Sequence, residues 1–298
     1  MQPLVASSPV TAWCRWGPPR VVDEAKVWQG RPVERTATLF IDAWLDWLFE
    51  RHQRDLTFQE LRRSVQALSA AYVERRKLNE APRALDGKGK RAAFACFFAP
   101  LHFLVVQEIL RALEAVAPRD QILDLGCGSL GAGLAWGMSL EVAPTLEGVD
   151  ANRWAVEEAR HNLDFSGLRG RVRVGDMLSV RFPVGRTGIV AAFAVNELQA
   201  PERAHLLERV VAAGAEGASI LVVEPIARTL TAGWWSGWET EVVRRGGRSD
   251  TWRLPVSLPR RLQEVDRAAG LNHRELKARS LWLAGSAIGS RSMAAPLV

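Results

Sequence analysis

The sequence predicts an α/β protein with a mostly parallel β-sheet that is covered by helices on both faces and follows a helical N-terminal region. Two observations support this fold class. From Gln121 onward, short apolar runs alternate with segments of helical periodicity, which implies right-handed βαβ units around a parallel sheet. Between residues 35 and 117, apolar residues recur at helical spacing instead.

The first part of the chain divides into a tail and a helical region. Residues 1–34 contain five prolines and no sustained periodicity, which predicts an irregular N-terminal tail. Residues 35–117 are predicted to be helical, with a capping box at Thr57 and Glu60. Within this region, residues 75–91 hold seven cations and two glycines and are predicted to form a basic loop. We expect the helix to resume after Pro100.

Residues 118–284 are predicted to form the α/β domain, and residues 285–298 a C-terminal tail. A Trp- and Arg-rich insertion over 228–258 is expected to interrupt the alternation, either as a lid beside a substrate or as an apolar patch that seals the sheet against the N-terminal helices. The predicted strands are 122–125, 146–149, 172–174, 189–195, 219–224 and 274–283, and the predicted helices are 131–140, one capped by Asn152, one opened by Pro201, and 259–269.

Composition excludes several classes of protein. With 48% apolar residues among 298, the chain is an ordinary globular sequence. No apolar run reaches the roughly 18 residues of a membrane span, and the start lacks a signal-peptide pattern. Three dispersed cysteines form no metal-ligand spacing and favour a cytoplasmic protein without a metal. A net charge of +6 is too small to indicate nucleic-acid binding by itself.

The segment from Asp124 to Gly131 joins a predicted strand to a predicted helix. A glycine turn at this place lets the backbone approach a ligand closely and directs helix N–H groups at it. Gly126, Gly128 and Gly131 match a dinucleotide-binding pattern. A dinucleotide oxidoreductase usually has an apolar residue where this chain has Asp124, whereas a carboxylate there favours a cationic ligand.

Two further acids follow the next two predicted strands. Asp150 lies 24 residues after Gly126, where a carboxylate can accept hydrogen bonds from both hydroxyls of a ribose. Asp176 follows the third strand. Acids at three successive strand ends indicate a pocket for a ribose, an adenine amino group and a positively charged moiety.

These motifs resemble the class I S-adenosylmethionine-dependent methyltransferases over residues 120–284. The resemblance implies a Rossmann-like seven-stranded methyltransferase fold and S-adenosyl-L-methionine as the cofactor. One departure is Leu130, where the family commonly has its third glycine, so that Gly131 is expected to take over its role. The matching segments are ILDLGCGSLGAG, LEGVDANRWAVEEARHNL, VRVGDML, AAFAVNEL and ILVVEP.

The resemblance also implies roles for individual residues. Asp124, Gly126 and Gly128 would line the methionine part of the cofactor, with Cys127 contributing its backbone. Asp150, with Ala151 beside it, would bind the ribose. The adenine would lie between Asp176 and Met177.

A narrower resemblance concerns the mitochondrial small-ribosomal-subunit assembly methyltransferase-like family. It rests on Tyr72, the pair at 75–76, the run AAFACFFAPLHFLVVQEIL, the Asn196 segment and the Glu224-Pro225 pair. It implies a helical region before the cofactor domain and an association with the ribosome. The family's cysteine cluster is absent, so its iron–sulfur site is not expected here.

The acceptor side of the reaction is predicted from the ends of later strands. Asn196 and Glu197 follow the fourth strand, near the expected position of the reacting methyl group, where Asn196 would position the acceptor beside the cofactor and Glu197 would be its base. The alternative is that both residues cap the following turn. Glu224 is a second carboxylate at this edge. His102 is a candidate for the roof of the pocket, although a lone histidine on an apolar helix is more often a core residue.

The sequence thus predicts a methyltransferase that acts on RNA or on a small molecule. Two alternatives remain: a non-catalytic S-adenosylmethionine-binding module in ribosome assembly, and a nicotinamide-dependent oxidoreductase. The oligomeric state is not predicted. His205 and His273 are weaker candidates for function.

Overall fold

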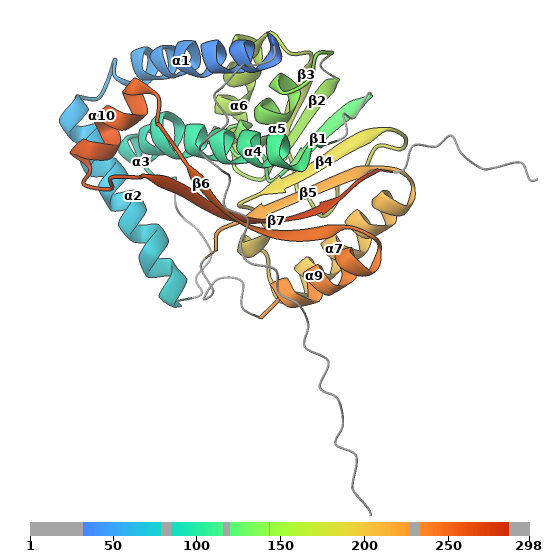
Figure 1. Ribbon diagram of the computed structural model, residues 1–298. Helices are drawn as coiled ribbons and strands as arrows, with labels where there is room; N and C mark the ends of the chain where they lie inside the picture. The colour runs from blue at the N-terminus through green and yellow to red at the C-terminus, as the bar shows by residue number, and fades with distance from the viewer. Residues whose placement is uncertain (1–31, 79–84, 116–119, 143, 227–232, 286–298) are drawn as a thin grey trace, which may run out of the picture.

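The computed structural model describes residues 32–78, 85–115, 120–142, 144–226 and 233–285. They form one seven-stranded sheet in the order β3-β2-β1-β4-β5-β7-β6 (Figure 1). Strands β1 to β5 pair in parallel, and β7 and β6 are antiparallel, so the predicted α/β class and mostly parallel sheet are confirmed. The strands are β1 Gln121–Leu125, β2 Thr145–Asp150, β3 Gly170–Val174, β4 Thr187–Ala192, β5 Ser219–Glu224, β6 Arg248–Pro255 and β7 Glu275–Leu283.

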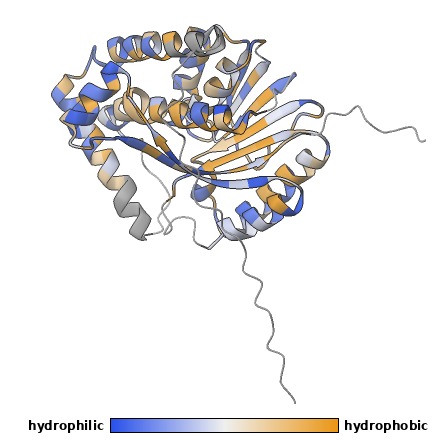
Figure 2. Ribbon diagram, in the orientation of Figure 1, coloured by the Kyte–Doolittle hydropathy of each residue, from blue (hydrophilic) through white to orange (hydrophobic). Residues whose placement is uncertain are grey.

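Helices cover both faces of the sheet. One hydrophobic cluster joins α1, α2, α4, α5, α6 and α10 to one face, and a second joins α7 and α9 to the other. The central strands are the most apolar part of the molecule (Figure 2), and all six residues of β5 are buried. The helices are α1 Pro32–His52, α2 Phe58–Leu78, α3 Lys88–Ala93, α4 Ala99–Leu113, α5 Gly131–Met138, α6 Arg153–Ser166, α7 Ala200–Ala215, α9 Trp235–Arg244 and α10 Arg260–Ala268.

The N-terminal helices pack directly on the α/β core. Trp44 of α1 donates its indole N–H to Asn162 of α6 at 2.8 Å. Arg51 and His52, in the last turn of α1, both contact the carboxylate of Glu158 on α6. Because these contacts are buried or half-buried, α1 is fixed to the sheet through α6. The boundaries predicted for the individual regions stay predictions.

The helical region differs from the prediction at its ends. Helix α1 begins at Pro32, and residues 1–31 lie outside the described residues. The predicted basic loop over 75–91 is wrong at both of its ends, since α2 continues to Leu78 and α3 begins at Lys88. The capping box before α2 is confirmed: Thr57 Oγ1 accepts from Glu60 N at 3.3 Å, and Glu60 Oε2 accepts from Thr57 N at 2.8 Å.

Helical structure is continuous before Pro100, where the sequence predicts that it resumes. A π-helical turn over Phe94–Phe98 joins α3 to α4, and Pro100 falls in the first turn of α4. Pro100 has no backbone N–H to donate within this continuous helix, and the π-helical turn lies directly before it. The stretch Lys88–Leu113 is long and apolar enough to cross a membrane, but 67% of its most apolar window is buried inside the protein, as in a core helix.

Two predictions in the α/β domain are corrected. Strand β4 ends at Ala192 instead of residue 195, because Phe193 adopts a left-handed conformation with φ of 59°. Residues 228–258 do not simply interrupt the fold: α9 and the edge strand β6 lie within them. Trp235 and Trp238 are buried against the face of the sheet that α7 covers, whereas Trp252 of β6 belongs to the cluster that includes the N-terminal helices.

Candidate active site

The sheet topology determines where a ligand can bind. From β1 the chain continues to β2 on one side, whereas β4 lies on the other side of β1. At such a switch point the connections leave in opposite directions, and a crevice opens outside the carboxyl ends of the strands. The loops that follow β1, β2, β3 and β4 meet at this edge. They carry the residues that the sequence singles out.

The glycine loop after β1 has the backbone that its glycines predict. Gly126 and Gly128 have φ values of 63° and 51°, in the left-handed region that glycine adopts without strain. Cys127 donates its backbone N–H to Val149 O of β2 at 3.0 Å, and its side chain is buried. The loop is therefore held against the end of β2.

Leu130 and Gly131 show how the chain departs from the usual glycine spacing. Leu130 has φ of 75°, a conformation that costs a non-glycine residue on the order of 1–3 kcal/mol. Its buried side chain fills the space that a Cβ atom would occupy on Gly148 of β2. At Gly131 a Cβ atom would lie 2.9 Å from the backbone oxygen of Ala99. Gly131 thus allows α4 to approach α5 closely. The left-handed backbone conformation that favours glycine is adopted by Leu130.

Asp124 lies beneath the loop. Its side chain is buried, and its Oδ2 accepts from Gly133 N at 2.8 Å. Burial raises the pKa of Asp124 to about 7, the Gly133 hydrogen bond lowers it, and the charge of Asp150 raises it further. The carboxylate thus holds the first turn of α5 in place. Its role toward the methionine moiety stays a prediction.

Asp150 stands at the carboxyl end of β2 and contacts the glycine loop. Its Oδ2 accepts from Gly128 N at 2.8 Å, and its Oδ1 accepts from Asn152 N at 2.8 Å. Burial raises the pKa of Asp150, while these two hydrogen bonds lower it. Each oxygen keeps a lone pair for a ligand hydroxyl. Ala151 is exposed beside it, and Asn152 caps α6 as predicted, accepting from Ala155 N at 3.1 Å.

The loop after β3 brings Asp176 and Met177 to the same edge. Asp176 is exposed and accepts from Leu178 N at 2.8 Å. The methyl carbon of Met177 lies 3.3 Å from the position of a Cβ on Gly126, and the methyl group of Ala194 lies 2.7 Å from it. The loops after β1, β3 and β4 therefore converge at Gly126.

Arg209 of α7 holds this loop in place, and the sequence analysis missed it. Its guanidinium donates to Met177 O at 3.3 Å and also to Leu178 O and Val180 O. It stacks on the ring of Phe182 at 4.0 Å. Since these partners lie about 30 residues away in the chain, no local pattern indicates the role of Arg209.

Asn196 and Glu197 lie on a 3-10 turn, Val195–Glu197, just after β4. The turn is held by Glu224 at the end of β5, whose Oε1 accepts from Val195 N at 2.8 Å and from Asn196 N at 3.1 Å. Glu224 is completely buried, and its Oε2 has no hydrogen-bond partner among the residues that the structure describes. Glu224 is thus a positioning residue for the segment that carries Asn196, which is half-buried, while Glu197 is exposed.

Glu224 makes stability depend on pH in a direction that can be tested. Burial raises the pKa of Glu224 to about 8, although two backbone N–H groups lower it. A carboxyl group whose pKa is higher in the folded state contributes stability below its unfolded pKa and loses it as pH rises through the folded value. We expect Glu224→Gln, which keeps an acceptor oxygen, to lose less stability between pH 5 and 8 than the parent protein.

Urea unfolding across this pH range measures the effect. The variant should still show part of the decline seen in the parent protein, because burial also raises the pKa of Asp124. Glu216→Gln, at an exposed position after α7, is the control. Identical pH profiles for Glu224→Gln and the parent protein would contradict the expectation.

The remaining candidates are placed as follows. His102 of α4 stacks on Phe193 immediately after β4, with ring centroids 4.0 Å apart. His205 is exposed on α7. His273 contacts the buried carboxylate of Asp266 on α10 through its ring and its backbone N–H, which is a structural contact.

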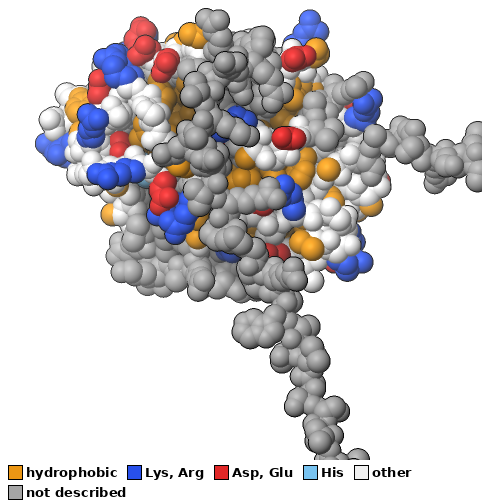
Figure 3. Space-filling view, in the orientation of Figure 1, with side chains coloured by type: hydrophobic (Ala, Val, Ile, Leu, Met, Phe, Trp, Pro, Cys, Tyr) orange, Lys and Arg blue, Asp and Glu red, His pale blue; other side chains and the backbone are white. Residues whose placement is uncertain are grey.

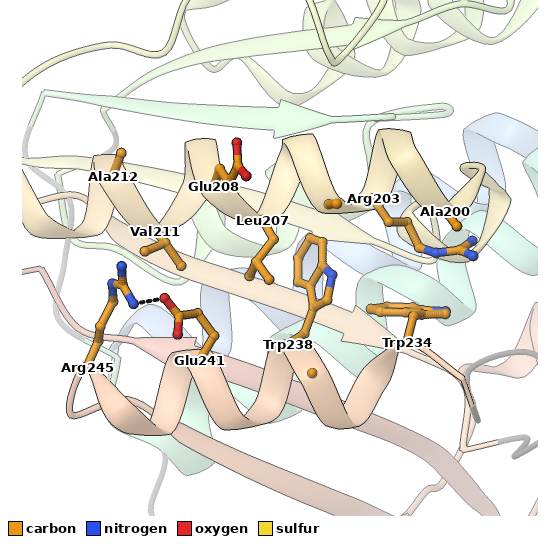
Figure 4. A pocket seen from close by; sticks show the side chains of 12 residues that line it. Ala200, Arg203, Leu207, Glu208, Val211, Ala212, Trp234, Trp238, Glu241 and Arg245 are labelled. Carbon is orange, nitrogen blue, oxygen red and sulfur yellow. Dashed lines mark hydrogen bonds and ion pairs between the residues drawn. The ribbon is translucent and has the colours of Figure 1, made fainter.

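The tryptophan-rich segment borders a separate groove between α7 and α9 (Figure 4). The groove has a volume of about 580 Å³, and Arg203 lies over the ring of Trp234 at one end. Glu241 and Arg245 form an ion pair at the other end. The residues of the glycine loop do not line it. On the face shown in Figure 3, cationic and anionic side chains of the described residues are interspersed.

Comparisons with known proteins agree with this arrangement. Residues 122–217 match a family model described as a methyltransferase domain. The match runs from β1 to the turn before β5, so it includes the glycine loop and the ends of β2, β3 and β4. These residues are thus similar to a methyltransferase domain. The narrower resemblance to the mitochondrial ribosome-assembly family stays a prediction.

Similar solved structures include a class I S-adenosylmethionine-dependent methyltransferase described as putative, from Listeria monocytogenes. It is 11% identical, with a TM-score of 0.45 over 87% of this chain and 90% of that one. Magnesium protoporphyrin IX methyltransferase from Synechocystis is 11% identical, with a TM-score of 0.44 over 73% and 92%. The YcgJ protein from Bacillus subtilis is 16% identical, with a TM-score of 0.40 over 61% and 98%. A search of curated protein sequences found no match.

Proposed function

We propose that this protein is a methyltransferase that uses S-adenosyl-L-methionine as methyl donor. The observation that carries the proposal is the position of Asp150 at the switch point of the sheet, bonded to the glycine loop. The methyltransferase domain over residues 122–217 supports the same function.

The donor set fits this cofactor. Asp150 keeps free lone pairs at a strand end, where a ribose would bind. Asp176 and Met177 follow β3, and Met177 lies against Gly126, where an adenine would bind. The left-handed glycines leave the loop backbone open to the methionine part. Each of these sites comes from a different loop. Arg209 holds the loop after β3 in place, and Glu224 holds the turn after β4 that carries Asn196.

The protein contributes mainly position to the reaction. When bound, the cofactor supplies an electrophilic methyl group. The chain's own residues hold donor and acceptor in line and exclude water, effects that are worth roughly 7–11 kcal/mol in favourable cases. Asn196, whose backbone is fixed by Glu224, is proposed to orient the acceptor at the end of β4.

Calorimetric titration with S-adenosylmethionine, S-adenosylhomocysteine and reduced nicotinamide cofactor tests the proposal. We expect the two adenosyl compounds to bind and the nicotinamide cofactor not to bind. Absence of binding at about 1 mM adenosyl compound, or tighter binding of the nicotinamide cofactor, would contradict it.

Incubation with the radiolabelled methyl donor and fractionated cell extract then identifies the acceptor. Label that enters RNA supports an RNA substrate, and label in the small-molecule pool supports a metabolite. Binding without any incorporation of label would favour the non-catalytic alternative.

A further inference from the structure

His102 occupies a place in the fold that its sequence neighbourhood does not reveal. It lies in the first turns of α4, the helix whose backbone packs against Gly131 at the start of α5. Its imidazole lies nearly parallel to the ring of Phe193, at an interplanar angle of 19°. Phe193 directly follows β4 and donates its backbone N–H to Val223 O at 2.7 Å. His102 is therefore fixed over the carboxyl end of β4.

An aromatic wall connects His102 to the glycine loop. Phe94, in the π-helical turn, meets His102 edge-on at 6.2 Å and Trp154 edge-on at 6.4 Å. The same Phe94 ring lies 3.2 Å from the position of a Cβ on Gly128. The wall thus borders the region where the cofactor would bind. π-Helical turns occur frequently at functional sites.

The ring nitrogens of His102 are available to a ligand. Within the described part of the chain neither nitrogen has a hydrogen-bond partner, and neither belongs to the fully buried polar atoms. Burial lowers the pKa of His102 to about 4, so the imidazole is uncharged at neutral pH. An uncharged imidazole offers one N–H donor and one nitrogen lone pair.

Asn196 lies at the same strand end, three residues after Phe193. Its side-chain amide has no hydrogen-bond partner among the described residues, while its backbone is held by Glu224. Ala194, between Phe193 and Asn196, touches the position of a Cβ on Gly126. One short segment therefore contacts both His102 and the glycine loop, and this is where donor and acceptor would meet.

We propose that His102 contacts the methyl acceptor and takes up the proton that a hydroxyl or N–H acceptor loses on methylation. The inference rests on the proposed methyltransferase function. It assigns the base to the roof of the crevice instead of to Glu197, the base that the sequence analysis expects.

The step balances in atoms and charge. The lone pair of the acceptor oxygen or nitrogen attacks the methyl carbon of the bound donor, and the carbon–sulfur bonding pair stays on sulfur. The acceptor's proton passes to the free ring nitrogen of His102 and then to water. One positive charge is present before the step and one after it, on imidazolium instead of sulfonium. A poorly solvated site therefore never has to hold two positive charges.

His102→Phe removes the two ring nitrogens and keeps an aromatic ring at this position. Phenylalanine keeps an aromatic face on Phe193 and fills the same space, but it cannot accept a proton. The matched control is His161→Phe, at an exposed position on α6. Calorimetry measures the affinity for S-adenosylhomocysteine, and transfer of radiolabelled methyl groups into cell extract measures turnover.

We expect His102→Phe to bind S-adenosylhomocysteine within about twofold of the parent protein and to transfer methyl groups at least about 100-fold more slowly. His161→Phe should match the parent protein in both measurements. Loss of affinity in parallel with turnover would place His102 at the cofactor and overturn the proposal, as would full turnover in His102→Phe.

Nuclear magnetic resonance of the histidine rings gives a readout that does not depend on turnover. The His102 signal is the one missing from His102→Phe. We expect it to show an uncharged ring from about pH 5.5 to 8 and to shift when S-adenosylhomocysteine is added. A signal unmoved by the ligand overturns the proposal. If the parent protein binds no S-adenosylhomocysteine at all, the proposed function itself fails.

Discussion

Asp150→Ala is expected to weaken the binding of S-adenosylhomocysteine by at least about 100-fold. The variant loses the carboxylate that accepts from Gly128 N and Asn152 N, each at 2.8 Å. It also loses the acceptor that we assign to the ribose hydroxyls. Hydrogen bonds to charged groups contribute about 1.5–3 kcal/mol each, so the loss of loop contacts and ligand contacts together supports this magnitude. Calorimetric titration measures it.

The fold should survive this substitution. Because burial raises the pKa of Asp150 above its usual range, the ionised carboxylate is less favourable in the folded protein than in the unfolded chain. We therefore expect thermal unfolding of Asp150→Ala at neutral pH to occur within a few degrees of the parent protein. A large fall in affinity with an unchanged melting temperature would identify a binding effect.

Asp164→Ala provides the matched control, since it removes an exposed carboxylate from α6 with the same change in charge. It should bind the ligand as the parent protein does. Asp150→Asn should be intermediate, because an amide keeps one acceptor oxygen. If Asp150→Ala binds within about threefold of the parent protein, the ribose assignment is wrong.

The parts of the site that could be predicted from sequence are those with a local signal. Gly126 and Gly128 predict a left-handed turn, because glycine is the residue that adopts a positive φ without strain. Asn152 predicts the start of α6, because its side chain accepts a hydrogen bond from the first turn of the helix. The buried strands β1, β2, β4 and β5 show as apolar runs because both of their faces are covered. These signals were enough to place Asp150 at a strand end.

The contacts that hold the loops in place have no such signal. Arg209 reaches carbonyls about 30 residues away, and Asn162 donates to Ser129 O, 33 residues away, at 2.9 Å. The sequence does not predict helix α9 and strand β6, because charged, exposed residues lie between their buried tryptophans and hide the periodicity. Which side chain supports which loop depends on packing between elements, and periodicity contains no information about it.

The largest effect on stability is expected at Glu158, on the inner face of α6. Its carboxylate accepts from Arg51 Nη1 at 2.6 Å and from Arg51 Nη2 at 2.9 Å, and His52 Nε2 lies 2.9 Å from it. The side chain of Glu158 is 1% exposed, whereas that of Arg51 is 28% exposed. Removing one partner of a buried ion pair typically costs about 3–5 kcal/mol. Because water still reaches Arg51, we expect about 3 kcal/mol for Glu158→Gln.

The pH dependence distinguishes this ion pair from simple packing. Burial raises the pKa of Glu158, but the hydrogen bonds and charges of His52 and Arg51 outweigh burial, and its pKa lies below the usual range. A carboxyl group with a depressed folded-state pKa contributes stability above its unfolded value, and that stability is lost as pH falls through the folded value. The difference in unfolding free energy between the parent protein and Glu158→Gln should therefore be largest near neutral pH and shrink below about pH 4.5.

Urea unfolding of Glu158→Gln and of Glu157→Gln, an exposed neighbour on α6, measures this difference. Glu157→Gln should change the free energy of unfolding by less than about 0.5 kcal/mol at any pH. If the loss of unfolding free energy in Glu158→Gln stays constant down to pH 3, packing rather than the ion pair holds α1 against α6. A loss that shrinks with acid would show that the ion pair joins them, and with them the N-terminal helices to the α/β domain.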